Sequence, residues 1–108
     1  MAEVDGGATS ARFEPVADET GECVLHVSGE VDLANAGLLR QAIEAFLASA
    51  PPRLVVDVRD LTFMDSSGLA VLLQAAAKVA QVVVRHPRSM IRRLIETTGV
   101  TSILQMEP

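Results

Sequence analysis

The fold of this chain is constrained most strongly by two apolar segments joined through a polar corner. Residues 54–58 are almost entirely apolar, which is typical of a strand covered on both faces of a sheet. The polar corner is Asp65-Ser66-Ser67-Gly68, and the apolar residues after it repeat at helical spacing. We therefore predict a buried strand, a short crossing loop, and a helix that begins at Ser66 or Ser67.

A hydroxyl group at the start of a helix has two interpretations. The first turn of a helix leaves backbone N–H groups unpaired, and the positive end of the helix dipole lies behind them. This environment suits a serine that carries a phosphate group. The same four residues could equally form an ordinary N-cap, followed by a glycine that relieves crowding at a tight corner.

The other elements follow from hydrophobic periodicity and turn residues. Residues 12–17 and 22–28 are expected to form a hairpin through a turn at residues 18–21. The first helix, capped by Asp32 or Asn35, has an apolar stripe of Leu39, Ile43, Phe46 and Leu47 and ends before Pro51. A second helix is predicted over residues 66–79 and a fourth strand over 82–85. Ser89 would cap a third helix, Gly99 would end it, and residues 101–105 would form the last strand.

This pattern predicts a single α/β domain with a mixed central sheet and the order β-β-α-β-α-β-α-β. A chain of 108 residues can bury one core, so residues 11–108 are assigned to the domain and residues 1–10 to a flexible tail. Cys23 is the single cysteine and lies in an apolar run, so we expect it in the core of a protein from a reducing compartment.

Composition also disfavours several classes of function. A net charge of −5 opposes direct nucleic-acid binding, and no apolar stretch is long enough to span a membrane. Two histidines and one cysteine, far apart in the sequence, indicate no metal centre, and no cofactor motif is present. Neither a catalytic triad nor a Cys-His pair can be identified. The N-terminus is acidic and unlike a signal peptide, so a cytoplasmic protein is expected.

Residues 60–69, with the sequence DLTFMDSSGL, resemble the signature of the anti-sigma factor antagonist family, the bacterial STAS domains. The resemblance extends to residues 27–33 (VSGEVDL), which are similar to an earlier turn of that family. It also includes residues 82–84 and residues 90–100, the second of which is similar to its third helix and closing glycine. Together these segments cover about residues 11–105, and they imply a STAS-type fold.

The resemblance implies a function in partner switching. In this family the first hydroxyl residue after the aspartate is phosphorylated, which corresponds to Ser66. An anti-sigma factor serine kinase would bind the unphosphorylated form through Asp32, Asp65, Ser66, Ser67 and Gly68. Phosphorylation would end that binding, and a separate serine phosphatase would restore it. The outcome would be regulation of sigma-factor-dependent transcription, in which the chain is a ligand and a substrate and not an enzyme.

Three alternatives stay open. The chain could be a STAS regulatory subunit of a lipid-transport ABC assembly, which would work without phosphorylation. Nucleotide binding is disfavoured, because no phosphate-binding G-x-x-x-x-G-K-[ST] loop is present. Five basic residues near the third helix could form either a solvated surface or a contact for an acidic partner: Arg85, His86, Arg88, Arg92 and Arg93.

Overall fold

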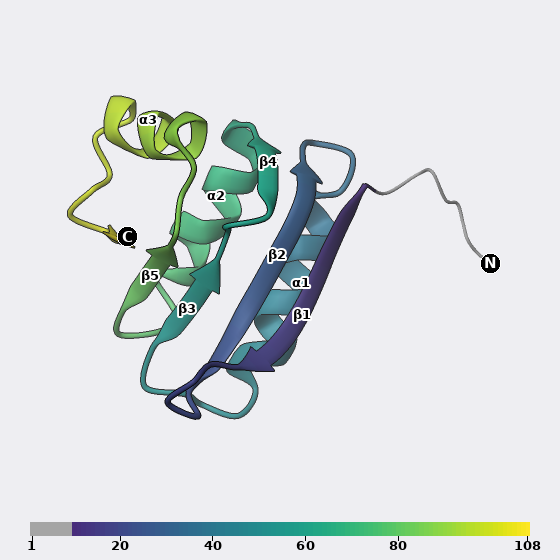
Figure 1. Cartoon of the computed structure of the whole chain (residues 1–108), viewed down its shortest axis with the longest axis vertical. Helices are drawn as coiled ribbons and strands as arrows, with labels where there is room; N and C mark the ends of the chain where they lie inside the picture. Colours follow the sequence, from purple (N-terminus) through teal and green to yellow (C-terminus); the bar gives the residue numbers. More distant parts are fainter. Residues whose placement is uncertain (1–9) are drawn as a thin grey trace.

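Six strands form one mixed sheet, and three helices pack against it (Figure 1). The computed structural model describes residues 10–108, so all but the last residue of the predicted tail lies outside the described residues. The strands are β1 (Ala11–Ala17), β2 (Cys23–Val31), β3 (Leu54–Asp57), β4 (Leu61–Met64), β5 (Val82–Arg85) and β6 (Leu104–Glu107). The helices are α1 (Ala36–Leu47), α2 (Ser66–Ala75) and α3 (Ser89–Thr97).

The arrangement of these elements confirms the predicted α/β class. β1 and β2 form the expected antiparallel hairpin, and parallel strands continue the sheet in the order β1-β2-β3-β5-β6. Figure 1 shows α1 and α2 behind the sheet and α3 close to β4. The predicted apolar stripe of α1 faces the shared core, where Leu39 and Ile43 are buried and Phe46 and Leu47 are partly buried.

The prediction of a loop between residues 58 and 65 is wrong, because Leu61–Met64 form strand β4. This strand pairs in parallel with the end of β2, at Gly29, Glu30 and Val31. A bulge between Gly29 and Glu30 lets β2 pair first with β3 and then with β4. The element order is therefore β-β-α-β-β-α-β-α-β.

Glycine is required at this bulge for two reasons. Gly29 has a φ of +89°, a backbone conformation that residues with a Cβ rarely adopt. A Cβ at Gly29 would also overlap the backbone carbonyl oxygen of Ser10, which lies directly against it. The exchange of partners along β2 thus depends on the absence of a side chain at this position.

Several predicted boundaries differ from the structure. α2 ends at Ala75 instead of residue 79, because the amides of Ala76, Ala77 and Lys78 form turn hydrogen bonds with α2 carbonyls. The last strand lies at Leu104–Glu107, where its register with β5 pairs Val82 with Leu104. Gly99 follows α3 with a φ of +74°, which confirms its predicted place.

The predicted cap of α3 and the burial of Cys23 are also wrong. Arg88 is the N-cap of α3, and Ser89 is the first helical residue. Cys23 is exposed, because it is the first residue of β2 and lies beside the hairpin turn, at the end of the sheet. The buried part of this apolar run begins only at the next residue, Val24.

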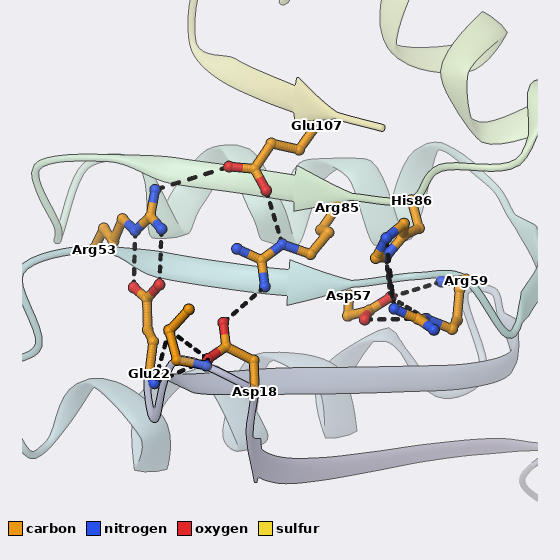
Figure 2. A network of polar contacts seen from close by, with 9 residues as sticks. Asp18, Glu22, Arg53, Asp57, Arg59, Arg85, His86 and Glu107 are labelled. Carbon is orange, nitrogen blue, oxygen red and sulfur yellow. Dashed lines mark hydrogen bonds and ion pairs between the residues drawn. The ribbon is translucent and has the colours of Figure 1, made fainter.

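The face of the sheet without helices is covered by a network of ion pairs (Figure 2). Arg85 on β5 donates to Glu107 on β6 at 2.8 Å and to Asp18 in the hairpin turn at 3.1 Å. Arg53 forms a bidentate pair with Glu22, with N–O distances of 2.7 and 2.8 Å. Three buried valines form a small second cluster of their own: Val24, Val55 and Val83. The charged side chains thus cover this face of the sheet, as the helices cover the opposite face.

Asp57 lies at the end of β3, and it is the one carboxylate that is buried among residues 10–108. Its Oδ1 accepts from the Arg59 amide at 3.0 Å and lies 3.3 Å from His86 Nδ1 (Figure 2). Burial opposes ionisation of this group. The Arg59 amide, the His86 ring and the Arg59 guanidinium outweigh that effect and lower the pKa of Asp57.

The network should make folding stability depend on pH. Hydrogen bonds from the Thr20 side chain, the Thr20 and Glu22 amides and Arg85 outweigh partial burial and hold the pKa of Asp18 at about 2. The unfolded value is about 3.9, so stabilisation is complete above about pH 4 and is lost as the pH falls towards 2. We expect the free energy of unfolding, measured with urea, to decline over this interval.

The variant Asp18→Asn should reduce the slope of that decline, because it removes the carboxylate that titrates. Glu19→Gln is the matched control, since Glu19 is exposed and forms no ion pair within residues 10–108. An Asp18→Asn variant with the same pH slope as the natural chain would contradict this prediction.

Candidate functional site

The ends of β2 and β4 bring the two predicted aspartates to the same corner of the molecule. Val31 and Met64 are neighbours in the parallel register, and the Asp65 amide donates to the Val31 carbonyl at 3.2 Å. Asp32 follows Val31 and Asp65 follows Met64, so the two residues leave adjacent strands at the same edge. The family resemblance implied that both residues belong to one binding surface, although the sequence analysis missed β4, the strand that brings them together.

Asp65 is the N-cap of α2, as expected for an aspartate before a helix. Its backbone is extended, and its Oδ1 accepts from the Ser67 amide at 2.8 Å. The helix therefore begins at Ser66, which is exposed, while Ser67 is half-buried. Within residues 10–108, Ser66 Oγ forms no hydrogen bond with another protein group. The Ser66 hydroxyl is thus open to solvent at the positive end of a capped helix.

Gly68 is buried and holds α2 close to the sheet. A Cβ at this position would lie 2.6 Å from Met64 Cγ and 2.9 Å from Val31 Cγ1. Val31 is β-branched and fully buried, so it has little freedom to move. Gly68 therefore positions the corner by allowing close packing and has no side chain to present to a partner.

Asn35 fixes the loop between β2 and α1, which carries Asp32. Its Nδ2 donates to the Glu30 carbonyl at 2.9 Å, and its Oδ1 accepts from the Asp32 amide at 3.0 Å. Asp32 Oδ1 in turn accepts from the Ala34 amide at 3.0 Å. Asn35 is the N-cap residue of α1, one of the two predicted candidates, but its side chain caps no helix N–H group. At 2% exposed it serves instead as a buried brace for the loop.

Two exposed apolar side chains next to this corner were missed by sequence reasoning. Leu33 follows Asp32 directly and is 80% exposed, and Phe63 on β4 is 41% exposed. Phe63 pairs with Glu30 in the register of β4 and β2. Large apolar groups are seldom so exposed without a partner when they cluster around polar groups. Leu33 belongs to none of the apolar stripes in the sequence, and this feature could have indicated that its side chain is exposed.

The five basic residues near α3 do not form one group. Arg85 is held in the ion-pair network, and His86 contacts Asp57. Arg88 Nε instead donates to the Arg59 carbonyl at 2.8 Å, which joins α3 to the loop after β3. Within the described part of the chain, Arg88 and Arg93 are exposed and take part in no ion pair. The structure therefore divides the predicted cluster between two surfaces.

Other kinds of site find no support in residues 10–108. No group of three or more His, Cys, Asp or Glu side chains there could hold a metal ion. No helix of that part has the length and apolar character needed to cross a membrane. A cavity of about 650 Å³ lies on the helix-free face, but apart from Glu19 the charged side chains that line it are held in ion pairs, among them Asp18, Arg85 and Glu107.

Known proteins resemble this chain over most of its length. A family model described as "Mlab, STAS domain" matches residues 16–105. The anti-sigma-F factor antagonist RsfB of Mycobacterium tuberculosis is 35% identical over 94 residues, which make up 84% of this chain and 77% of that protein.

Solved structures show the same fold. A crystal structure of an anti-sigma factor antagonist from Mycobacterium paratuberculosis has a TM-score of 0.77 at 33% identity, and covers 97% of this chain and 91% of that one. Unphosphorylated SpoIIAA, also an anti-sigma factor antagonist, has a TM-score of 0.72 at 19% identity, with 90% and 89% of the two chains covered. The second similarity concerns the fold alone.

Proposed function

Because the chain belongs to the STAS-domain family of anti-sigma factor antagonists, we propose that it is a cytoplasmic anti-anti-sigma factor controlled by phosphorylation of Ser66. The unmodified form would bind an anti-sigma factor serine kinase and so release a sigma factor. The kinase would transfer the γ-phosphoryl group of its ATP to Ser66 Oγ, and a serine phosphatase would later hydrolyse the ester. In this scheme the protein is a ligand and a substrate, not an enzyme.

The observation that carries this proposal is the exposed Ser66 hydroxyl at the start of a capped helix, next to two aspartates. A phosphate group there adds about −1.5 to −2 charges at pH 7. The helix N-terminus stabilises such a charge by about 0.3–1 kcal/mol, so the fold should tolerate it. A partner surface complementary to the neutral hydroxyl would instead meet a dianion beside Asp32 and Asp65. Modification can thus end binding without refolding.

The apolar side chains beside the corner supply the attractive part of the interface. Leu33 and Phe63 flank Asp32 and Asp65, and their burial against the kinase would contribute most of the hydrophobic free energy. The aspartates and Ser66 would then provide the polar contacts that distinguish the two states of the switch. We assign Asp32, Asp65, Ser66, Ser67 and the backbone at Gly68 to the binding surface together with these two apolar residues.

Replacing Leu33 with aspartate should weaken kinase binding by about tenfold or more, because the substitution removes a central apolar contact and adds charge. The free energy of unfolding should hardly change, since Leu33 is 80% exposed. Ile103→Asp is the matched control, because Ile103 is 48% exposed and lies between α3 and β6. Calorimetric titration of both variants with the kinase measures the difference, and equal affinities would remove Leu33 from the interface.

Mass spectrometry tests the phosphorylation itself. The chain is incubated with ATP and each anti-sigma kinase of its organism, and the modified residue is mapped in peptides. We expect one phosphate on Ser66, retained in Ser67→Ala and absent in Ser66→Ala. A phosphate on Ser67 would move the switch to the neighbouring hydroxyl. A folded chain that no kinase modifies would contradict the proposal.

The description of the matching family model supports one competing function. That model carries the name Mlab, so the chain could instead be the STAS regulatory subunit of a lipid-transport ABC assembly. The same corner would then contact an ATPase, and Ser66 would act only as a polar contact. Purification of the tagged chain with its bound partner separates the two functions, since an ATPase of a transporter indicates the second and a serine kinase the first.

A further inference from the structure

β1 is the outermost strand of the sheet (Figure 1), so half of its backbone hydrogen-bonding groups have no neighbouring strand in this chain's sheet. The register pairs Ala11 with Gly29 and Ala17 with Cys23, and hydrogen bonds join Ser10 to Glu30 and Asp18 to Glu22. Because bonded and non-bonded pairs alternate in an antiparallel ladder, even-numbered residues of β1 bond to β2. The backbone groups of odd-numbered residues therefore face outwards.

The residues on this outer side are suited to a short additional ladder. Ala11 and Phe13 each offer an N–H and a C=O group, whereas Pro15 offers only its C=O group. Proline at such a position is typical of an edge strand, where it limits pairing with other chains. Ala17 also offers both groups but lies alone beyond the proline, so two neighbouring outward-facing residues with both groups occur only at Ala11 and Phe13.

Apolar surface lies directly beside this edge. Two cavities of about 540 and 410 Å³ follow one another between β1 and α1, and both are lined by Phe13 and Ala42. Leu38 on α1 lines the first cavity and is 42% exposed. A segment that extends the sheet would thus bury apolar side chains on the helix side of β1.

We propose that a second copy of this chain occupies the edge, by antiparallel pairing of the two β1 strands about a two-fold axis at Phe13. In this register Arg12 of each copy lies opposite Glu14 of the other, so the charges are complementary in both directions. The two Phe13 residues exchange both of their outward hydrogen bonds. Each Ala11 N–H donates to the Pro15 carbonyl of the other copy, so the proline costs no central bond.

Neighbouring registers are disfavoured by the same residues. An axis at Arg12 places the two arginines opposite each other, and an axis at Glu14 does the same with the two glutamates. An axis at Pro15 loses the central hydrogen bonds, because proline has no N–H group. Among axes placed between Arg12 and Pro15, the sequence of β1 therefore favours the one at Phe13, which gives the self-complementary contacts of a two-fold interface.

The proposal is tested by sedimentation equilibrium of the full chain at low ionic strength. We expect a concentration-dependent dimer whose dissociation constant rises about tenfold in Arg12→Glu or Glu14→Arg, because each creates two like-charged pairs. The double variant Arg12→Glu/Glu14→Arg should restore the original value. Arg93→Glu is the control of equal charge change, since Arg93 lies on α3, away from β1.

Amide hydrogen exchange gives a second readout at the level of single residues. The Phe13 amide should exchange rapidly in the dilute monomer and slowly at concentrations where the dimer forms. The Arg12 amide, which bonds to β2, should be protected in both. A monomer at all concentrations overturns the proposal, and so does a dimer that ignores Arg12→Glu and leaves Phe13 unprotected. Neither result bears on phosphorylation of Ser66.

Discussion

Ser66→Asp is expected to weaken binding of the cognate anti-sigma kinase by about 100-fold or more, whereas Ser66→Ala should keep nearly the full affinity. The exposed serine lies at the first position of α2, close to Asp32 and Asp65. A third carboxylate there would oppose a surface that accepts a neutral hydroxyl. Removing the hydroxyl costs only a single solvent-exposed polar contact. Isothermal titration of both variants against the kinase measures the contrast.

Two controls separate a local switch from a general effect of charge. Ser102→Asp adds the same carboxylate to an exposed serine in the segment before β6, and it should bind like the natural chain. Thermal unfolding of all variants should give similar midpoints, because the carboxylate introduced by Ser66→Asp would lie at a helix N-terminus, where negative charge is favourable. Equal affinities of Ser66→Asp and Ser66→Ala would refute the switch, although the chain could still bind the kinase constitutively.

Gly29→Ala is expected to destabilise the fold by about 3 kcal/mol or more, from left-handed backbone strain together with steric overlap. The added Cβ would meet the Ser10 carbonyl, which belongs to the backbone and has no rotamer to escape into. The bulge at Gly29 also sets the pairing of β2 with β4, so relaxation of the clash should displace the strand that leads to Asp65. Denaturant unfolding measures the loss.

Two other glycines separate the contributions. Gly21 has the same φ of +89° but open space around it, so Gly21→Ala reports the strain alone, about 1–2 kcal/mol. Gly37 lies in α1, where an added Cβ meets only the end of Arg40 at 3.9 Å, and Gly37→Ala should be neutral or stabilising. If Gly29→Ala costs no more than Gly21→Ala, the close contact with Ser10 is not what makes glycine necessary.

The sequence predicted the features of this fold that depend on local patterns. The start of α2 at Ser66 and the apolar stripe of α1 follow from the polar corner and from periodicity, whereas a surface shared by Asp32 and Asp65 was implied by the family resemblance. Strand β4 could not be found in this way. It has only four residues, and its two central side chains are exposed. It also depends on the bulge in β2, which lets the end of that strand pair with β4 instead of β3.

The surface of the site was harder to predict than its backbone, for a related reason. Whether Leu33 and Phe63 are exposed depends on how a loop and an edge strand end, and no periodicity describes such positions. The ion pairs of Arg85 with Asp18 and Glu107 join three segments far apart in the sequence. The predicted burial of Cys23 was wrong because apolar neighbours in the sequence do not show at which residue a sheet ends.

The bracing of the Ser66 corner has a consequence for the speed of the proposed switch. The Asp65 cap, the close packing at Gly68 and the Asn35 brace hold the corner in one arrangement, so no rearrangement of the chain should separate modification from its effect. Loop motions in proteins take nanoseconds to microseconds, and domain rearrangements take microseconds to milliseconds. Here the delay after phosphoryl transfer would be the residence time of the complex itself. Response time would therefore be set by this residence time together with the catalytic rates of the kinase and phosphatase, and tuning either enzyme would retime the system without changing this protein.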